Sequence, residues 1–214
     1  MNQYKILDVD VNELPFADFL TSRYSMTVKV NAQKTYDLSK KEKIPFFNLT
    51  SACILETINE IPEFRQRIVD GKVVEYRKIN AVSPIMQNDH TIREIEIKPA
   101  SEFGDIFEWS EYVENKKSNI EDNQYMVEPM KRDAEPIANL SCIPWIDFDS
   151  MTSIIASPHQ IMPVISWGKL VDGKMPVSLT ASHVFIFGWH FKLFYEKLEE
   201  YLNNPERLLE RRKV

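Results

Sequence analysis

The chain has 214 residues, of which 43% are hydrophobic and 27% charged, and its formal net charge at pH 7 is −6. A chain of this length can bury a sizeable core in one or two domains. The negative charge, with no basic run before Arg211-Arg212-Lys213, argues against nucleic acid as a partner.

Several common classes of site find no support in the sequence. Residues 1–10 are mixed and charged, and no apolar run approaches a membrane span, so we expect a cytoplasmic protein without a membrane partner. Cys53 and Cys142 fit no CxxC or metal-ligand spacing, which predicts reduced core residues and no metal site. The five glycines form neither a GxGxxG nor a GxxxxGK[ST] pattern, so a nucleotide-binding loop is not expected.

The first part of the chain predicts a short edge strand and a short helix within residues 1–20. Residues 24–30 alternate apolar and polar side chains, which is typical of a strand. A helix is predicted from Pro45 to about Glu60, where Ile61-Pro62 ends it. Asp70-Gly71 predicts a hairpin with a two-residue turn, because both residues tolerate positive φ angles.

The middle of the chain predicts strands over residues 81–86, 92–98 and 137–143, a helix from 103 to about 122, and a loop over 123–136. A further strand over 161–171 is followed by a hairpin turn at Asp172-Gly173. About eight strands and three main helices in mixed order predict an α+β fold. We expect a two-layer sandwich with a large mixed β-sheet, in a single domain over residues 1–214.

The stretch 176–202 contains the candidate catalytic residue. Its hydrophobic period changes from 2 to about 3.6, which predicts a strand that leads to His183 and then a helix ended by Asn203-Asn204-Pro205. Gly188 is expected to let the backbone turn between the two elements or approach another segment closely. A histidine at the end of a buried strand can be held rigidly and still be reached; the alternative is a core histidine without a catalytic role.

The segment Ser182–Gly188 resembles the His-His-x-x-x-Asp-Gly signature of chloramphenicol acetyltransferases, which the acyltransferase cores of 2-oxo acid dehydrogenase complexes share. His183 and Gly188 match, whereas Ser182 replaces the first His and Phe187 the Asp. Further stretches that resemble the family in order and spacing are Ile61-Pro62-Glu63-Phe64-Arg65 followed by Asp70-Gly71, Ser141 to Phe148 with Pro144-Trp145, and Met162 to Lys169. The resemblance covers about residues 8–202.

The resemblance implies the coenzyme A-dependent acyltransferase fold and a homotrimer that acetylates a small hydroxylated acceptor, such as chloramphenicol, from acetyl-CoA, and thus a role in antibiotic resistance. His183 would be the general base and would face acceptor-binding residues of a neighbouring subunit. Ser141 would stabilise the oxyanion of the tetrahedral intermediate. The remaining implied contacts are Trp145, Ser166, Lys169 and Leu170 with the coenzyme, and Tyr24 and Phe187 with the acceptor.

Some of these positions also have a plain structural interpretation. Trp145 after Pro144 fits core packing about equally well, and Ser166 fits a hydrogen-bonded strand residue. His159 and His190 are expected to be surface or core histidines, because their spacing from His183 does not make a metal site.

In the family, the Asp of the signature pairs with an arginine near the N-terminus, and here Phe187 and Phe16 fall at these two positions. Replacing both partners of a buried ion pair with apolar residues can be neutral or stabilising. The sequence therefore predicts that the Phe16 and Phe187 rings contact each other directly, within about 6 Å, and so keep His183 in place.

Three functions remain open at this point. The first is an acetyl-CoA-dependent O-acetyltransferase of the chloramphenicol acetyltransferase type, and the second is an acyltransferase with another hydroxyl acceptor. The third is a non-catalytic trimer that keeps only the fold. His183 and Ser141 favour an enzyme, whereas Ser182, Phe187 and Leu170 favour the third. An acyl-transfer core of a dehydrogenase complex is less expected, because no lipoyl-domain sequence precedes the matched region.

Overall fold

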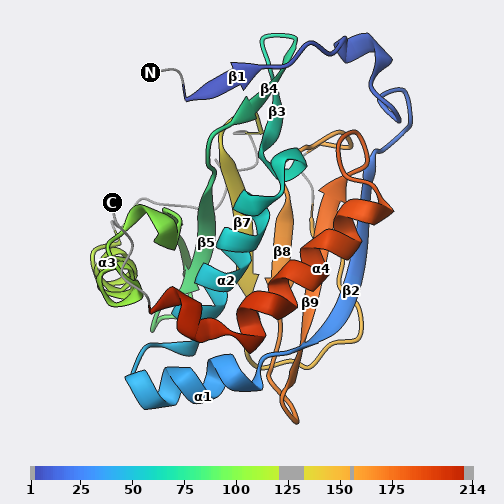
Figure 1. The fold of residues 1–214 in the computed structure, drawn as a ribbon. Coiled ribbons are helices and arrows are strands. Elements are labelled where there is room, and N and C mark those ends of the chain that lie inside the picture. Colours follow the sequence, from blue (N-terminus) through green and yellow to red (C-terminus); the bar gives the residue numbers. More distant parts are fainter. Residues whose placement is uncertain (1–2, 121–132, 155–156, 210–214) are drawn as a thin grey trace.

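The computed structural model describes residues 3–120, 133–154 and 157–209. In this part of the chain, helices α2 (Phe46–Glu60) and α4 (Gly188–Asn203) lie against one face of a large β-sheet, and a small sheet lies at one end of it (Figure 1). The main apolar core lies between these two layers.

The large sheet has the strand order β2-β9-β8-β7-β5-β6. Its strands are β2 (Arg23–Asn31), β5 (Asn80–Met86), β6 (Ile92–Ile97), β7 (Ile137–Cys142), β8 (Val164–Trp167) and β9 (Lys174–Ser182). Strand β7 is parallel to both of its neighbours, and the other pairs are antiparallel. The prediction of an α+β fold with a large mixed sheet is therefore confirmed.

The small sheet has the order β1-β4-β3 and consists of β1 (Tyr4–Ile6), β3 (Gln66–Val69) and β4 (Lys72–Tyr76). Asp70 and Gly71 have φ angles of 50° and 71°, which confirms the predicted two-residue turn between β3 and β4. In the stretch that precedes this hairpin, Phe64 is buried, and the Arg65 guanidinium pairs with the Glu75 carboxylate at 3.1 Å. This family-like stretch is thus structural.

The remaining α-helices of the described residues are α1 (Gln33–Glu42) and α3 (Ile106–Ser118). The sequence did not predict α1, because this helix buries only Thr35, Leu38 and Ser39 and has no apolar stripe to reveal it. Most of the loop predicted over 123–136 lies outside the described residues. Among the described residues, no helix combines the length and the apolar character needed to span a membrane.

Two predictions in the second half of the chain need adjustment. The strand predicted over 161–171 is only the four residues of β8, although the turn at Asp172 and Gly173, with φ angles of 49° and 78°, is present. The turning role expected of Gly188 is wrong: this residue does not have a positive φ, and a Cβ atom there would meet no described atom within 4 Å. Gly188 is simply the first residue of α4.

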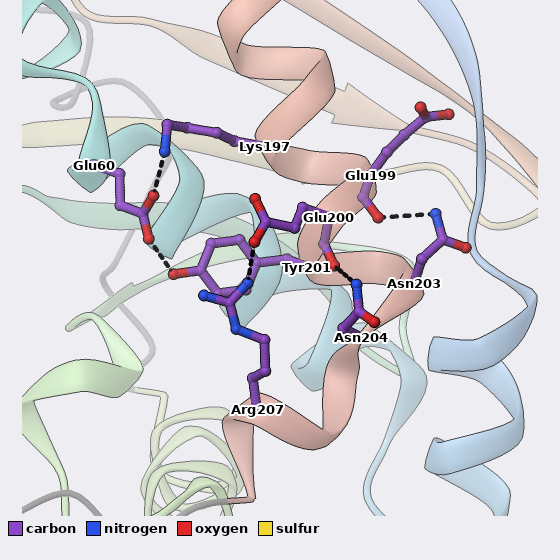
Figure 2. Close-up of polar contacts among 8 residues, drawn as sticks. All are labelled: Glu60, Lys197, Glu199, Glu200, Tyr201, Asn203, Asn204 and Arg207. Carbon is purple, nitrogen blue, oxygen red and sulfur yellow. Dashed lines mark hydrogen bonds and ion pairs between the residues drawn. The ribbon is translucent and has the colours of Figure 1, made fainter.

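Polar contacts tie the end of α2 to α4 (Figure 2). The Glu60 carboxylate accepts hydrogen bonds from the Lys197 ammonium group, at 2.6 Å, and from the Tyr201 hydroxyl. Partial burial raises the pKa of Glu60, but these two hydrogen bonds outweigh it, so the net pKa is below the usual value. The ionised carboxylate therefore holds the ends of the two helices together.

Candidate active site

A row of small hydroxyl side chains crosses the face of the large sheet that points away from the helices. Ser141, Ser166, Ser178 and Thr27 are direct neighbours on β7, β8, β9 and β2, so their side chains share this face. Leu140, Ile165 and Leu179, one position away, point into the core on the other face. The hydroxyl-lined face is therefore the side of the sheet on which polar chemistry can be placed.

Ser141 lies where two cavities of this face meet. The smaller cavity has a volume of about 280 Å³ and the larger about 640 Å³, and both are lined by Ser141 and Pro84. A hydroxyl group at such a junction can reach molecules bound on either side of it. This placement is the one that an oxyanion donor between two substrates needs.

The larger cavity brings together three of the four residues predicted to bind the coenzyme, namely Trp145, Lys169 and Leu170. The Trp145 side chain is 63% exposed, so its interpretation as core packing is wrong. Phe46 and Phe47, at the start of α2, also line this cavity, together with Trp167. The cavity is thus lined mainly by aromatic and aliphatic side chains, with lysines among them.

The wall that carries Trp145 is held by backbone contacts with the end of β8. The Ile143 amide donates to the Trp167 carbonyl, and the Lys169 amide donates to the Ile146 carbonyl, both at 2.8 Å. A Cβ atom on Gly168 would lie 2.4 Å from the Ile146 carbonyl oxygen, which is closer than any side chain allows. Glycine at position 168 therefore lets the two segments approach, and this close approach shapes the larger cavity.

The smaller cavity contains Ser166, the fourth predicted coenzyme residue, and so separates it from the other three. Ser166 is 1% exposed, and its hydroxyl makes no hydrogen bond with the described residues. By contrast, the Ser178 hydroxyl donates to the Met151 carbonyl at 2.7 Å. The interpretation of Ser166 as a satisfied strand residue is therefore wrong, and its buried hydroxyl is available to a ligand in this cavity.

His183 directly follows β9, and its main chain is fixed to the segment before β2. Its amide donates to the Ser22 carbonyl at 2.6 Å. Next to it, the hydroxyl oxygens of Ser22 and Ser182 lie 2.9 Å apart and are hydrogen-bonded, with both residues buried. Ser182, which replaces the first histidine of the family signature, thus anchors the strand end that carries His183.

Aromatic rings surround the imidazole of His183, which is partly exposed. The ring centroids of Phe16 and Tyr24 lie 4.1 and 4.6 Å from the imidazole in stacked geometry, and that of Phe187 lies 5.0 Å away in edge geometry. The Tyr24 hydroxyl donates to the Ile186 carbonyl at 2.9 Å, and burial raises the pKa of Tyr24 to about 12. Both predicted acceptor residues, Tyr24 and Phe187, therefore lie beside His183.

The predicted direct contact between Phe16 and Phe187 is wrong, because their ring centroids are 6.4 Å apart. Both rings contact the imidazole of His183 instead, which draws Phe16 onto its face and leaves Phe187 at its edge. Phe187 also takes the position before α4 at which Asp would cap the helix. Here its backbone amide donates to Nδ1 of His190, at 2.8 Å, so His190 has a structural role.

Within one chain, Ser141 and His183 do not meet. Ser178 lies in the same cross-strand row as Ser141, two strands away, and His183 is five residues further along the chain. Strand geometry therefore separates Ser141 from His183 by about 20 Å. Among the described residues that line the two cavities at Ser141, His183 is absent. The predicted catalytic pair could form only between two copies of the chain.

The sequence analysis missed part of the larger cavity. The Phe47 ring stacks on Trp167 with centroids 5.7 Å apart, and the Lys117 ammonium group lies 4.3 Å from the Phe47 centroid. The pair Phe46-Phe47 at the start of a predicted helix was a signal that could have been used. Lys117 gave none, since a lysine near the end of a charged helix is ordinary. In the described residues, no His, Cys, Asp or Glu side chains gather as metal ligands would.

Comparison with known proteins gives one consistent result. The family model described as chloramphenicol acetyltransferase matches residues 12–199. Chloramphenicol acetyltransferases from Staphylococcus aureus and Bacillus pumilus are 26% and 24% identical to this chain over 192 and 202 residues. The first match covers 86% of both proteins, and the second covers 85% of this chain and 86% of the relative.

Solved structures similar to this chain point to the same family. A chloramphenicol acetyltransferase matches with a TM-score of 0.81 and 27% identity, over 93% of this chain and 99% of that one. A truncated catalytic core of the 2-oxoacid dehydrogenase complex from Thermoplasma acidophilum matches with a TM-score of 0.64 and 15% identity, over 94% and 99% of the two chains. This second likeness is one of fold alone.

Proposed function

The chain belongs to the chloramphenicol acetyltransferase family and is an acyltransferase, and on this premise we propose that it transfers an acetyl group from acetyl-CoA to a hydroxyl group of a small acceptor. The position of Ser141 at the junction of two cavities carries this proposal. A ternary acyl transfer needs two substrates that meet at one oxyanion donor. Chloramphenicol is the first acceptor to test.

The larger cavity suits the coenzyme. Its aromatic and aliphatic wall, which includes Trp145 and Phe47, suits the pantetheine arm of coenzyme A. Lys169, exposed at this wall, offers a positive charge to the phosphates. Leu170 adds apolar surface to the cavity wall, and its side chain has no group that could hydrogen-bond to the coenzyme. The acceptor would then occupy the smaller cavity, where the Ser166 hydroxyl can hydrogen-bond to it or to a bound water.

His183 would act from a second copy of the chain. Because His183 lies about 20 Å from Ser141 within one chain, the base that serves Ser141 has to come from a neighbouring subunit. This geometry supports the expected homotrimer, in which each interface combines His183 of one copy with the two cavities of the next.

In this arrangement, His183 takes the proton of the acceptor hydroxyl, and the acceptor oxygen attacks the thioester carbonyl carbon of acetyl-CoA. The Ser141 hydroxyl donates a hydrogen bond to the developing oxyanion. The tetrahedral intermediate then collapses and expels the coenzyme A thiolate, which takes the proton back from the imidazolium. The products are the acetylated acceptor and coenzyme A, with no covalent acyl-enzyme.

An acceptor other than chloramphenicol is the second candidate, and the lining of the smaller cavity favours it. Glu94, Asn139 and Gln160 contribute polar side chains to this wall. Polar groups in a pocket discriminate strongly between ligands that can and cannot hydrogen-bond to them. An acceptor that carries polar groups besides the reacting hydroxyl would fit this wall.

Thiol release from acetyl-CoA in the presence of chloramphenicol tests the proposal. We expect turnover by the native protein, and a loss of about 10²–10⁴-fold in His183→Ala, as removal of a general base causes. His90→Asn serves as the control, because His90 lies in an exposed turn with a φ of 64°, a conformation that Asn tolerates.

The outcomes separate the candidates. Turnover with other hydroxylated compounds and not with chloramphenicol would establish the second candidate. No turnover with any acceptor, together with no acetyl-CoA binding by calorimetry, would overturn the proposal. Equal turnover by His183→Ala and the native protein would show that His183 is not the base.

A further inference from the structure

The imidazole of His183 lies between two aromatic rings. Phe16 and Tyr24 both stack on it, with interplanar angles of 20° and 28°. Two rings at centroid distances of 4.1 and 4.6 Å could not share one face of the imidazole, because they would overlap each other. They therefore cover opposite faces, and Phe187 approaches at 69° and covers part of the edge.

Among the described residues, ring contacts and not hydrogen bonds set the orientation of this imidazole. Nδ1 of His183 is buried and makes no hydrogen bond with any described residue. The hydrogen bond from the His183 amide to Ser22 fixes the main chain but leaves the side-chain torsions free. A general base needs a fixed ring plane, because a misplaced base loses much of its effect. Here the two stacked rings supply that restraint.

Phe16 reaches this position through an unusual backbone conformation. Its φ is 60°, in the left-handed region that bulky residues rarely adopt. Such conformations persist where the surrounding structure enforces them, and they cluster at functional sites. The neighbouring ring of Phe19 packs edge-on against Phe16, with centroids 5.1 Å apart, and supports it from the side.

We propose that Phe16 is a positioning residue for the catalytic base: together with Tyr24 it clamps the His183 imidazole and directs Nε2 toward the acceptor hydroxyl. This inference rests on the proposed function. The clamp also favours the reaction itself, since the imidazole becomes positively charged when it takes the acceptor proton. The faces of aromatic rings attract a cation, so the two rings stabilise the charged form more than the neutral one.

Substitution of the Phe16 ring tests the clamp. Phe16→Leu keeps an apolar side chain but removes the aromatic face, and we expect kcat to fall about tenfold while KM for acetyl-CoA stays unchanged. Phe16→Tyr restores the face and should restore kcat. Phe107→Leu is the matched control, because it removes an exposed ring on α3 that lines neither cavity, and its kcat should change less than about twofold.

A spectroscopic readout separates this inference from the proposed function. The chain has four histidines, so the imidazole proton resonances of His183 can be assigned by their absence in His183→Ala. We expect ring-current shifts to high field in the native protein, which diminish in Phe16→Leu and return in Phe16→Tyr. This measurement needs no turnover, so it tests the clamp even if the acceptor is wrongly chosen.

The proposal is overturned if Phe16→Leu loses the ring-current shift and keeps the native kcat, because the clamp would then be irrelevant to catalysis. It is also overturned if Phe16→Tyr fails to restore either quantity, because the effect would then come from shape and not from ring stacking. Thermal unfolding of each variant checks that the fold is kept. If Phe16→Leu does not fold, Phe16→Met takes its place, because methionine also fills the space of the ring without an aromatic face, and the same two outcomes then decide.

Discussion

The two halves of the candidate site are built in opposite ways. At the end of β9, contacts within one chain hold His183: its amide donates a hydrogen bond to the Ser22 carbonyl, and stacked rings fix its imidazole. At Ser141, by contrast, both cavities are open, Trp145 is exposed, and the Ser166 hydroxyl makes no hydrogen bond with the described residues. The chain thus preorganises the residue proposed as the base and leaves the proposed substrate half incomplete.

This difference has a physical reason. A base is useful only if its orientation is fixed before the substrate arrives, and packing within the chain can provide that. Substrate-binding polar groups have to remain available, so satisfying them within the chain would remove their function. In the proposed reaction, the separation of about 20 Å between Ser141 and His183 requires that the two halves meet across copies.

The largest expected effect is on activity, when subunits that lack Ser141 are mixed with subunits that lack His183. Ser141→Ala and His183→Ala proteins should each lose at least about 10²-fold in kcat. When the two variants are unfolded, mixed in equal amounts and refolded, random assembly should place both native residues at about a quarter of the sites. Thiol-release assays should then show activity far above either variant refolded alone. Activity equal to the simple sum of the two variants would contradict a shared site.

A substitution at Gly168 should disturb the wall of the larger cavity. In Gly168→Ala, the new Cβ would meet the Ile146 carbonyl at 2.4 Å, and neither backbone segment can easily move. We expect a loss of stability of about 3 kcal/mol and weaker acetyl-CoA binding. Gly188→Ala is the control, because a Cβ there meets open space; urea unfolding should show stability unchanged or slightly raised. Equal unfolding midpoints for both variants would rule out this packing role.

The anchor of the His183 half can be tested through its buried hydroxyl pair. Ser182→Ala leaves the buried Ser22 hydroxyl without its partner, and we expect a loss of about 1–2 kcal/mol in the free energy of unfolding. The double variant Ser22→Ala/Ser182→Ala removes both groups and should lose less than the sum of the two single variants. Additive losses in chemical denaturation would show that the two hydroxyls do not depend on each other.

The smallest effect concerns the helix contact at Glu60 (Figure 2), which involves no residue of either half. The folded-state pKa of Glu60 lies below its usual value of 4.5. Its stabilising effect is therefore fully present above pH 4.5 and is lost as the pH falls through the lower, folded-state pKa. Because the side chain is 38% exposed, solvent screening limits the effect to under about 1 kcal/mol.

Thermal unfolding between pH 3 and 7 checks this prediction, with Glu60→Gln as the control. The difference in melting temperature between native protein and variant should shrink as the pH falls. A constant difference over this range would mean that the charge of Glu60 does not stabilise the fold. Neither outcome should alter the catalytic pH dependence, since Glu60 contacts Lys197 and Tyr201 on α4 and neither cavity.

The sequence by itself determined the elements whose signals are local. The two Asp-Gly turns, helix α2, strand β2 and the change from β9 to α4 follow from periodicity and turn chemistry, which adjacent residues decide. The same local pattern placed His183 at a strand end. Helix α1 was not predicted, because it packs through few apolar side chains and so leaves no apolar stripe in the sequence.

Only the tertiary structure decided how the site is assembled. The sequence placed Phe16 opposite Phe187, but the fold stacks Phe16 on His183, since which ring contacts which depends on how distant segments pack. The same holds for Gly168 against Ile146 and for Ser141 at the junction of two cavities. Such contacts join residues far apart in the chain, and no local period or turn preference encodes them, because packing is fixed by the whole core at once.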